Sequence, residues 1–242
     1  MLWQKEKALF LEQEYQNKRH QIAQYFDKTA IKAWEKLTSD DRLSFIRESV
    51  RSGREKMQGH ILDRLGTDLS GKDIFDAGCG TGSLAMEFSS RNANVVAVDI
   101  SPSLIKIARE RFSSGSNSQM PSVKFVWGDM LDPSFGEFDH IVLMDSAIHY
   151  KSSNSIGLIK ELCSRARESI IFTFVPLTPL LALKFSLGKI FPKKDRAPSI
   201  EPCSEKTICN LIEKNIEGWH IAGTTRVSTY FYTSQAVELR RD

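Results

Sequence analysis

A glycine-rich stretch at residues 74–82 carries the clearest chemical signal in the chain. It reads Ile-Phe-Asp-Ala-Gly-Cys-Gly-Thr-Gly, so an apolar run and an acid lead directly into alternate glycines. Glycine adopts positive φ at little cost and lets a ligand approach the backbone closely. A helix that starts near the last glycine directs unpaired N–H groups and its positive dipole end at this turn. The stretch therefore predicts a site for a nucleoside cofactor that carries a negative group, and the residues expected to contact it are Asp76, Gly78, Cys79, Gly80 and Gly82.

Asp99 ends the next apolar run, 94–99, and supports the same site. In a parallel sheet, a carboxylate at this strand end can accept hydrogen bonds from both hydroxyl groups of a ribose. Ile100 follows it and is expected beside the cofactor. The alternative is that Asp99 only caps the helix that begins at residue 102.

Gly128, Asp129 and Met130 follow a third apolar run, 122–127. Asp129 can accept a hydrogen bond from an adenine amino group, and Met130 can cover the ring. Helix capping is again the alternative. Because the glycines are spaced G-x-G-x-G, the loop differs from the G-x-G-x-x-G of dinucleotide sites. It is similar to motif I of S-adenosylmethionine (SAM) methyltransferases, and SAM is the predicted cofactor.

The fourth apolar run leads into Leu-Met-Asp-Ser-Ala-Ile-His-Tyr at residues 143–150. Methyltransferases that modify exocyclic amines usually carry an Asn/Asp-Pro-Pro-aromatic motif at this place, so adenine, cytosine and glutamine acceptors are disfavoured. Asp145 is expected to contact the cofactor. His149 is predicted to lie at the reacting methyl group, and a purely structural hydrogen-bonding role is its alternative.

The N-terminal residues 24–30 suggest a lid that brings Tyr25 to the site, although Tyr25 and Phe26 can equally fasten the first helix to the core. Further along, Arg47, Arg51 and Arg54 follow one another at intervals of four and three, which places them on one side of a helix. One of them is expected to pair with a carboxylate of SAM or of the substrate, and Arg51 is the predicted cofactor contact. A solvated basic face is the other interpretation.

The elements that position these side chains follow an α/β pattern. Residues 1–62 read as a helical arm, in which a second helix starts at the N-cap cluster 38–41 and presents Leu43, Ile46, Val50, Met57 and Ile61 on one side. Beyond it the predicted strands are 73–76, 94–99, 122–127, 139–145 and 169–175, and the helices between them are 82–91, 102–113 and 155–166. This alternation predicts a parallel sheet with helices on both faces and a binding crevice at the carboxyl ends of its strands.

An insertion at about 176–203 follows the fifth predicted strand. After a helix at 204–215, two strands at 218–223 and 225–233 are expected to form a hairpin, which must be antiparallel. A parallel sheet that ends in an antiparallel hairpin is the Rossmann-like layout of class I SAM methyltransferases. The chain is accordingly divided into an N-terminal arm or lid, 1–62, and a SAM-binding domain, 63–242.

The composition of the chain excludes several classes of function. The 242 residues are 26% charged and 41% hydrophobic, and the net charge of +3 is too small to indicate nucleic-acid binding. Four cysteines form no zinc-like spacing and are expected to be reduced thiols. The most apolar stretch, 170–191, is interrupted by Pro176 and Pro179 and is not expected to span a membrane. A cytoplasmic location is expected, and contact with a membrane surface is left open.

Several segments together resemble the magnesium-protoporphyrin IX O-methyltransferase family, in its bacteriochlorophyll-pathway form, over about residues 22–235. The likeness covers residues 25–30, 37–40, 50–54, 128–133, 144–150 and 191–202. Its specific parts are Tyr25-Phe26-Asp27, Ile148-His149-Tyr150 and Pro192-Lys193-Lys194-Asp195-Arg196-Ala197-Pro198. The first 20 residues match no known pattern.

The resemblance implies methyl transfer from SAM to one propionate of Mg-protoporphyrin IX, a step of chlorophyll or bacteriochlorophyll synthesis, with substrate delivered by magnesium chelatase. It places Tyr25 and His149 at the reacting propionate. Lys193, Lys194 and Arg196 are expected to meet the second propionate or anionic lipid head groups, and a plain solvated loop is the alternative. Peripheral contact with photosynthetic membranes and a plastid stroma are left open. Whether His149 acts as a base, an orienting group or a Mg²⁺ ligand stays open. The competing hypotheses are a methyltransferase of another small molecule, such as a quinone or phenol, and a non-catalytic SAM or tetrapyrrole binder.

Overall fold

The sheet at the centre of the computed structural model has seven strands in the order β3-β2-β1-β4-β5-β7-β6. The structure describes residues 2–27, 45–115, 123–177 and 200–242. Five strands run parallel: β1 (Asp73–Ala77), β2 (Asn94–Asp99), β3 (Val123–Trp127), β4 (Phe138–Leu143) and β5 (Ala166–Phe174). The C-terminal strands β6 (Trp219–Ser228) and β7 (Thr233–Arg241) pair antiparallel, and β7 pairs antiparallel with β5.

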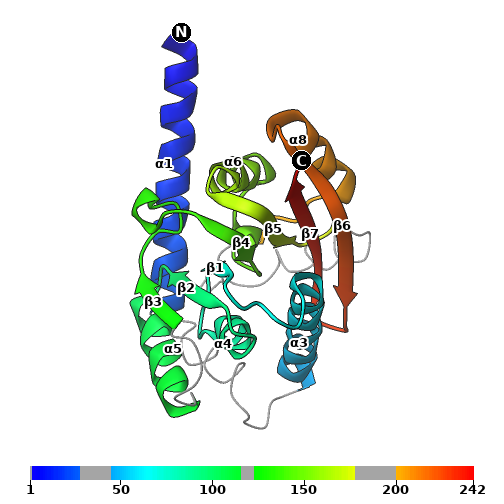
Figure 1. The fold of residues 1–242 in the computed structure, drawn as a ribbon. Coiled ribbons are helices and arrows are strands. Elements are labelled where there is room, and N and C mark those ends of the chain that lie inside the picture. The colour runs from blue at the N-terminus through cyan, green and yellow to red at the C-terminus, as the bar shows by residue number, and fades with distance from the viewer. Residues whose placement is uncertain (1, 28–44, 116–122, 178–199) are drawn as a thin grey trace.

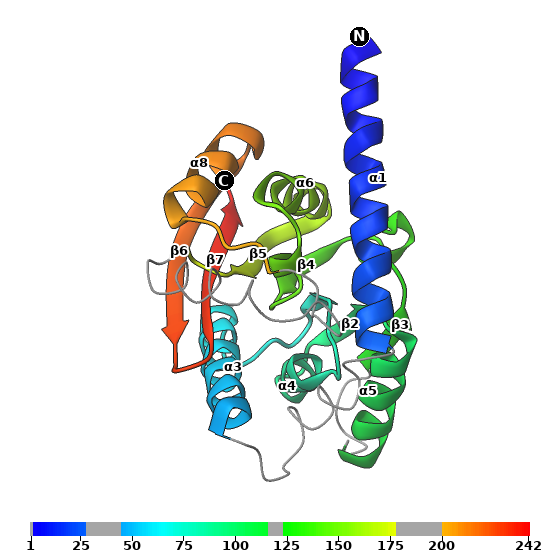
Figure 2. The ribbon, with the colours of Figure 1, turned by 180° about the vertical axis from the view of Figure 1, so that it is seen from behind.

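Helices cover both faces of this sheet (Figures 1 and 2). One buried cluster joins the sheet to α1 (Leu2–Tyr25), α6 (Ser152–Cys163) and α8 (Glu205–Asn215). A second joins the opposite face to α3 (Phe45–Leu65), α4 (Ser83–Ser90) and α5 (Pro102–Gly115). The short 3-10 helices η2 (Pro133–Phe135) and η3 (Ala147–His149) lie in the loops before and after β4. The doubly covered sheet with its antiparallel C-terminal strands confirms the predicted fold class.

The predicted parallel strands agree with the observed ones to within about three residues at each end. The prediction of the C-terminal hairpin was wrong about the position of its turn. We expected the chain to reverse near residue 224, whereas β6 continues to Ser228 and Thr229 N–H donates to the Tyr232 carbonyl at 2.7 Å across the turn. The reason is that β6 is an edge strand with few buried side chains. Its polar sequence therefore lacks the apolar run that marked the other strands.

Helix α3 packs its middle and end against β6 and β7, with Met57 and Ile61 fully buried. The predicted apolar face was wrong at the start of this helix, where Ile46 is 54% exposed. Ser49 and Gly53 take the buried positions instead. The predicted helix start at 38–41 and Leu43 lie outside the described residues.

Helix α1 is long, and Figure 1 shows its first half standing away from the remainder of the fold. Its second half packs on the sheet through Tyr15 and Ile22, which are 8% and 7% exposed. At its end, the Asp27 carboxylate lies 3.3 Å from both Ser101 Oγ and Ser103 N. The helix therefore crosses from the body of the fold to the start of α5.

The ends of the predicted insertion lie side by side. Pro176 and Cys203 form a parallel β-bridge, and Leu177 N–H donates to the Cys203 carbonyl at 2.9 Å. The segment between them, with the predicted contacts of Lys193, Lys194 and Arg196, falls outside the described residues.

Candidate active site

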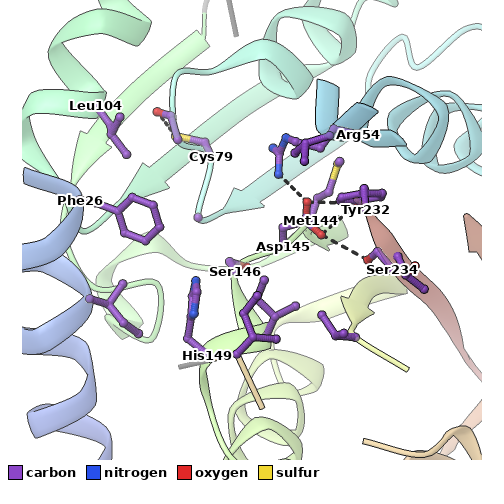
Figure 3. A pocket seen from close by; sticks show the side chains of 18 of the residues that line it. Phe26, Arg54, Cys79, Leu104, Met144, Asp145, Ser146, His149, Tyr232 and Ser234 are labelled. Atoms are coloured by element: carbon purple, nitrogen blue, oxygen red, sulfur yellow. Dashed lines mark hydrogen bonds and ion pairs between the residues drawn. The ribbon is translucent and has the colours of Figure 1, made fainter. Parts of the chain in front are cut away.

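A large cavity of about 1470 Å³ opens at the carboxyl ends of the parallel strands. Its described walls come from α1, the start of α3, the loops after β1 to β4, and the β6–β7 turn. Figure 3 shows side chains from these separate segments facing the same space. The lining includes the predicted site residues except Asp76, Gly82 and Arg51. Elements far apart in the sequence therefore converge as the α/β pattern requires.

The loop after β1 bends tightly because its glycines take conformations that other residues rarely adopt. Gly78 has φ 87° and Gly82 has φ 80°. A Cβ at Gly78 would lie 2.4 Å from Cβ of Ser146, and one at Gly82 would lie 2.7 Å from the Phe125 ring. Gly78 N–H and Cys79 N–H both donate to the Val98 carbonyl. Glycine at these positions therefore allows the loop to pack closely against Phe125 of β3 and the loop after β4.

Two carboxylates lie behind this loop. Asp99 accepts hydrogen bonds from Gly80 N–H at 2.8 Å and Ser101 N–H at 2.9 Å, and it lines the cavity. Burial raises the pKa of Asp99. Asp76 is 2% exposed. Its pKa is raised from 3.8 to about 7, mainly by burial and to a smaller extent by the nearby Asp99 charge. The site thus holds a pair of acids whose buried charge is only partly compensated, a state that a cationic ligand would relieve.

Asp129 lies in the loop after β3, and α1 contacts it directly. Tyr15 Oη donates to Asp129 Oδ1 at 2.7 Å, and Arg19 forms an ion pair with Oδ2. Gly128, Met130 and Ile100 line the cavity beside it. The sequence predicted Asp129 but not Tyr15 or Arg19, because 114 and 110 residues separate these partners and no local pattern links them.

Asp145 organises the wall on the α3 side of the cavity. Its φ of 55° is left-handed, a conformation that Asp tolerates better than most residues. The Tyr232 hydroxyl lies 3.2 Å from both carboxylate oxygens, and Thr173 and Ser234 donate to one of them. Arg54 pairs with the other oxygen (Figure 3). The carboxylate is thus an internal anchor that joins α3 to β5 and the hairpin.

The three candidate arginines of α3 have different surroundings. Arg54 and Arg47 line the cavity. Arg51 extends away to Glu48 at 2.9 Å and Glu55 at 3.8 Å, and it is not among the described lining residues. As a cofactor contact, Arg51 stays a prediction, and the geometry favours Arg54 for that role.

His149 and Tyr25 both line the cavity from different segments. His149 ends the short helix η3 and is 7% exposed. Its ring lies edge-on to Phe26, with 5.9 Å between ring centroids, and Phe26 in turn contacts the ring of the partly buried Tyr25 at 5.3 Å. Burial raises the pKa of Tyr25, so its hydroxyl stays a hydrogen-bond donor at neutral pH. The two predicted catalytic side chains are therefore joined through Phe26.

An aromatic cluster forms the outer rim of the cavity. Phe45 at the start of α3 lies 5.6 Å from Tyr230 and 6.1 Å from Phe231 in the β6–β7 turn, measured between ring centroids. All three are at least 49% exposed. The predictions missed this cluster because the hairpin turn was expected elsewhere. An apolar rim of this kind marks the entry of an apolar ligand or a contact surface.

Comparison with known proteins relates this chain to a family of methyltransferases. Residues 143–241 match the family model described as the magnesium-protoporphyrin IX methyltransferase C-terminus, and residues 74–168 match that of a methyltransferase domain. The chain is 39% identical over 228 residues to magnesium-protoporphyrin O-methyltransferase of Rhodobacter capsulatus, covering 94% of this chain and 98% of that protein. It is 30% identical over 223 residues to the chloroplastic magnesium protoporphyrin IX methyltransferase of Arabidopsis thaliana, covering 90% and 69%.

A solved crystal structure shows the same relationship at the level of the fold. The crystal structure of magnesium protoporphyrin IX methyltransferase from Synechocystis with bound SAH superposes with a TM-score of 0.81 and 26% identity, covering 91% of this chain and 98% of that one. Sequence likeness over nearly the whole chain and likeness of fold point to the same relatives. The chain therefore belongs to the magnesium-protoporphyrin IX methyltransferase family.

Proposed function

We propose that this protein transfers a methyl group from SAM to a propionate carboxylate of Mg-protoporphyrin IX and so forms the monomethyl ester in chlorophyll or bacteriochlorophyll biosynthesis. The observation that carries the proposal is one continuous cavity of about 1470 Å³ with Asp99, Asp129 and His149 on its wall. Pockets for one drug-sized ligand measure about 300–1,000 Å³. The larger volume suits a nucleoside cofactor and a tetrapyrrole together.

The residues present fit SAM on chemical grounds. Gly78 and Gly80 of the loop line the cavity, Asp99 offers acceptors for ribose hydroxyls, and Asp129 offers one for an amino group. The Asp99 carboxylate, which lines the cavity, can supply negative charge near a cationic ligand. When bound, SAM supplies an electrophilic methyl group on a sulfonium. We assign Gly78, Gly80, Asp99 and Asp129 to its binding.

The acceptor needs positioning more than it needs a base. A propionate has a pKa near 4–5 in water and is already ionised at neutral pH. The protein must hold one carboxylate oxygen in line and exclude water that weakens its nucleophilicity. We assign these tasks to His149, which lines the cavity, and to Tyr25, whose hydroxyl can donate to the same group. Phe26 between them excludes water.

The outer part of the cavity suits a broad apolar ring. Phe45, Tyr230 and Phe231 present aromatic surface at the rim, and Arg47 adds a positive charge that can meet the second propionate. The sequence assigned this role to Lys193, Lys194 and Arg196, which lie outside the described residues. Anionic lipid head groups are the other proposed partners of those three.

Two finer proposals concern partners and place. No described helix is both long and apolar enough to span a membrane. We propose a cytoplasmic or stromal location, with substrate arriving through transient contact with magnesium chelatase or from the surface of a photosynthetic membrane. Co-sedimentation with anionic vesicles, with and without Mg-protoporphyrin IX, would test the membrane contact.

A substrate panel tests the proposed reaction. The protein is incubated with SAM and, separately, with Mg-protoporphyrin IX, metal-free protoporphyrin IX, a quinol and a phenol, and methylated products are measured by mass spectrometry. We expect the monomethyl ester of Mg-protoporphyrin IX to form fastest. Faster methylation of the quinol or phenol would support the other small-molecule activity. SAM binding without any methylated product would indicate a binding protein.

A further inference from the structure

Helix α1 holds the acid at the adenine end of the proposed cofactor site. Tyr15 Oη and Leu131 N–H donate to Asp129 Oδ1 at 2.7 Å and 3.0 Å, and Arg19 Nη1 donates to Oδ2. A carboxylate can accept about four hydrogen bonds in all. The contacts made within the described chain therefore leave one acceptor position, and it is on Oδ2.

The two α1 donors are themselves well placed to fix this carboxylate. Tyr15 is 8% exposed and stacks on Tyr150, with 5.4 Å between the ring centroids. Burial raises the pKa of Tyr15, so its hydroxyl remains a donor across the neutral range. The Arg19 side chain is 35% exposed and lines the same cavity as Asp129. Donors on both oxygens prevent the carboxylate from rotating freely.

We propose that Tyr15 and Arg19 are positioning residues for the cofactor's adenine, because they turn the remaining acceptor position of Asp129 toward the exocyclic amino group. This inference rests on the proposed use of SAM and deepens it. It gives the N-terminal helix a defined task. Helix α1 forms a wall of the cofactor site, and it favours a base with an amino donor over one with a keto oxygen.

Equilibrium binding of two product analogues tests this assignment. S-adenosylhomocysteine (SAH) carries the amino group, whereas S-inosylhomocysteine carries a keto oxygen at the same place and would set an acceptor against Asp129. Isothermal titration calorimetry gives Kd for each ligand without any turnover. The wild-type protein should bind SAH about tenfold or more tightly than the inosyl analogue, as expected for a hydrogen bond to a charged group.

Tyr15→Phe removes the hydroxyl that donates to Asp129, and Arg19→Gln replaces the charged guanidinium with a shorter, neutral amide. In both, we expect this preference to shrink by about threefold or more, because a carboxylate that can turn is a poorer match to the amino group. Glu14→Gln is the matched control on the same helix. Glu14 contacts Lys151 at 3.1 Å and Asn154 at 3.3 Å, and its replacement should leave the preference unchanged.

Each outcome has a definite reading. If SAH and the inosyl analogue lose affinity by the same factor in Tyr15→Phe and Arg19→Gln, α1 only supports the fold and the inference is overturned. Tighter SAH binding by Arg19→Gln would also overturn it, because Arg19 would then compete with adenine. Absence of SAH binding by the wild-type protein would contradict the proposed function itself, and the inference with it.

Discussion

At the scale of single residues, the proposed chemistry centres on His149, which the sequence predicted at the reacting methyl group and which lines the cavity while 7% exposed. If it orients the acceptor carboxylate, it acts on substrate in the transition state and contributes little to cofactor binding. His149→Ala should therefore lower kcat by about 10²–10⁴-fold, as for other positioned acid–base groups, while Kd for SAH stays nearly constant.

His220 provides the matched control for this measurement. It is an exposed histidine on β6, and its Nδ1 lies 2.7 Å from a carboxylate oxygen of Asp242, away from the cavity lining. His220→Ala should leave kcat and SAH binding unchanged. Turnover by His149→Ala at the wild-type rate would remove His149 from the mechanism.

The buried acid Asp76 predicts a specific pH dependence of stability. Burial and the nearby Asp99 raise the pKa of Asp76 from 3.8 in the unfolded chain to about 7 in the folded protein. Between these values folding takes up a proton, so the unfolding free energy falls as pH rises, by at most about 1.4 kcal/mol per pH unit. The loss levels off above the folded-state pKa of about 7.

Thermal unfolding of the ligand-free protein from pH 5 to 8 checks this. Asp76→Asn carries no ionisable group there, so its stability relative to wild type should increase as pH rises across this range. Asp63→Asn, at an exposed position on α3, should follow the wild-type profile. Parallel profiles for wild type and Asp76→Asn would show that Asp76 is ionised in the folded state throughout.

At the scale of elements, the packing of α3 on the hairpin can be tested at two of its glycines. A Cβ at Gly53 would lie 2.4 Å from Cδ1 of Tyr232, the residue that contacts Asp145, whereas one at Gly59 would meet nothing within 4 Å. Gly59→Ala should stabilise the protein by about 0.5–1 kcal/mol through helix propensity. Gly53→Ala should destabilise it by about 1–3 kcal/mol through overpacking.

Chemical unfolding of the two glycine variants separates these effects, since both remove a glycine from the same helix. Gly53→Ala should also weaken SAH binding, because displacement of Tyr232 disturbs the wall that Asp145 organises. Equal stability of the two alanine variants would contradict the close contact between Gly53 of α3 and Tyr232 in the β6–β7 turn.

The sequence revealed those elements whose burial leaves a local pattern. The strands β1, β2, β4 and β5 read as apolar runs because both faces of a parallel sheet are covered, and Asp99 and Asp129 were found because parallel strand ends share one edge. The edge strand β6 has few buried side chains, so its extent was missed. Ile46 was misassigned because helical periodicity alone cannot tell where the partner surface ends.

The side chains that contact Asp129 and Asp145 could not be predicted from local sequence patterns, for a different reason. Tyr15 and Arg19 reach Asp129 across 114 and 110 residues, and Tyr232 reaches Asp145 across 87. No spacing rule connects such pairs, because their distance is set by the packing of whole helices on the sheet. Side chains at strand ends were therefore predictable, whereas the partners that orient them were not.

At the scale of the whole molecule, the sheet brings one set of strand ends, one long helix and one hairpin turn around a single cavity of about 1470 Å³. Glycines and acids line the part of this cavity at the strand ends, and aromatic side chains line its outer rim. This division fits the proposed binding of a polar nucleoside and a broad apolar acceptor in one cavity.

The most direct test of the central claim is the stoichiometry of a single turnover. Enzyme in excess is mixed with SAM and limiting Mg-protoporphyrin IX, and SAH and porphyrin products are quantified together by mass spectrometry. The proposed reaction requires one SAH for each monomethyl ester, with methylation confined to a propionate and no diester. Formation of SAH without the ester, or recovery of unmodified Mg-protoporphyrin IX from protein shown to bind SAM, would contradict it.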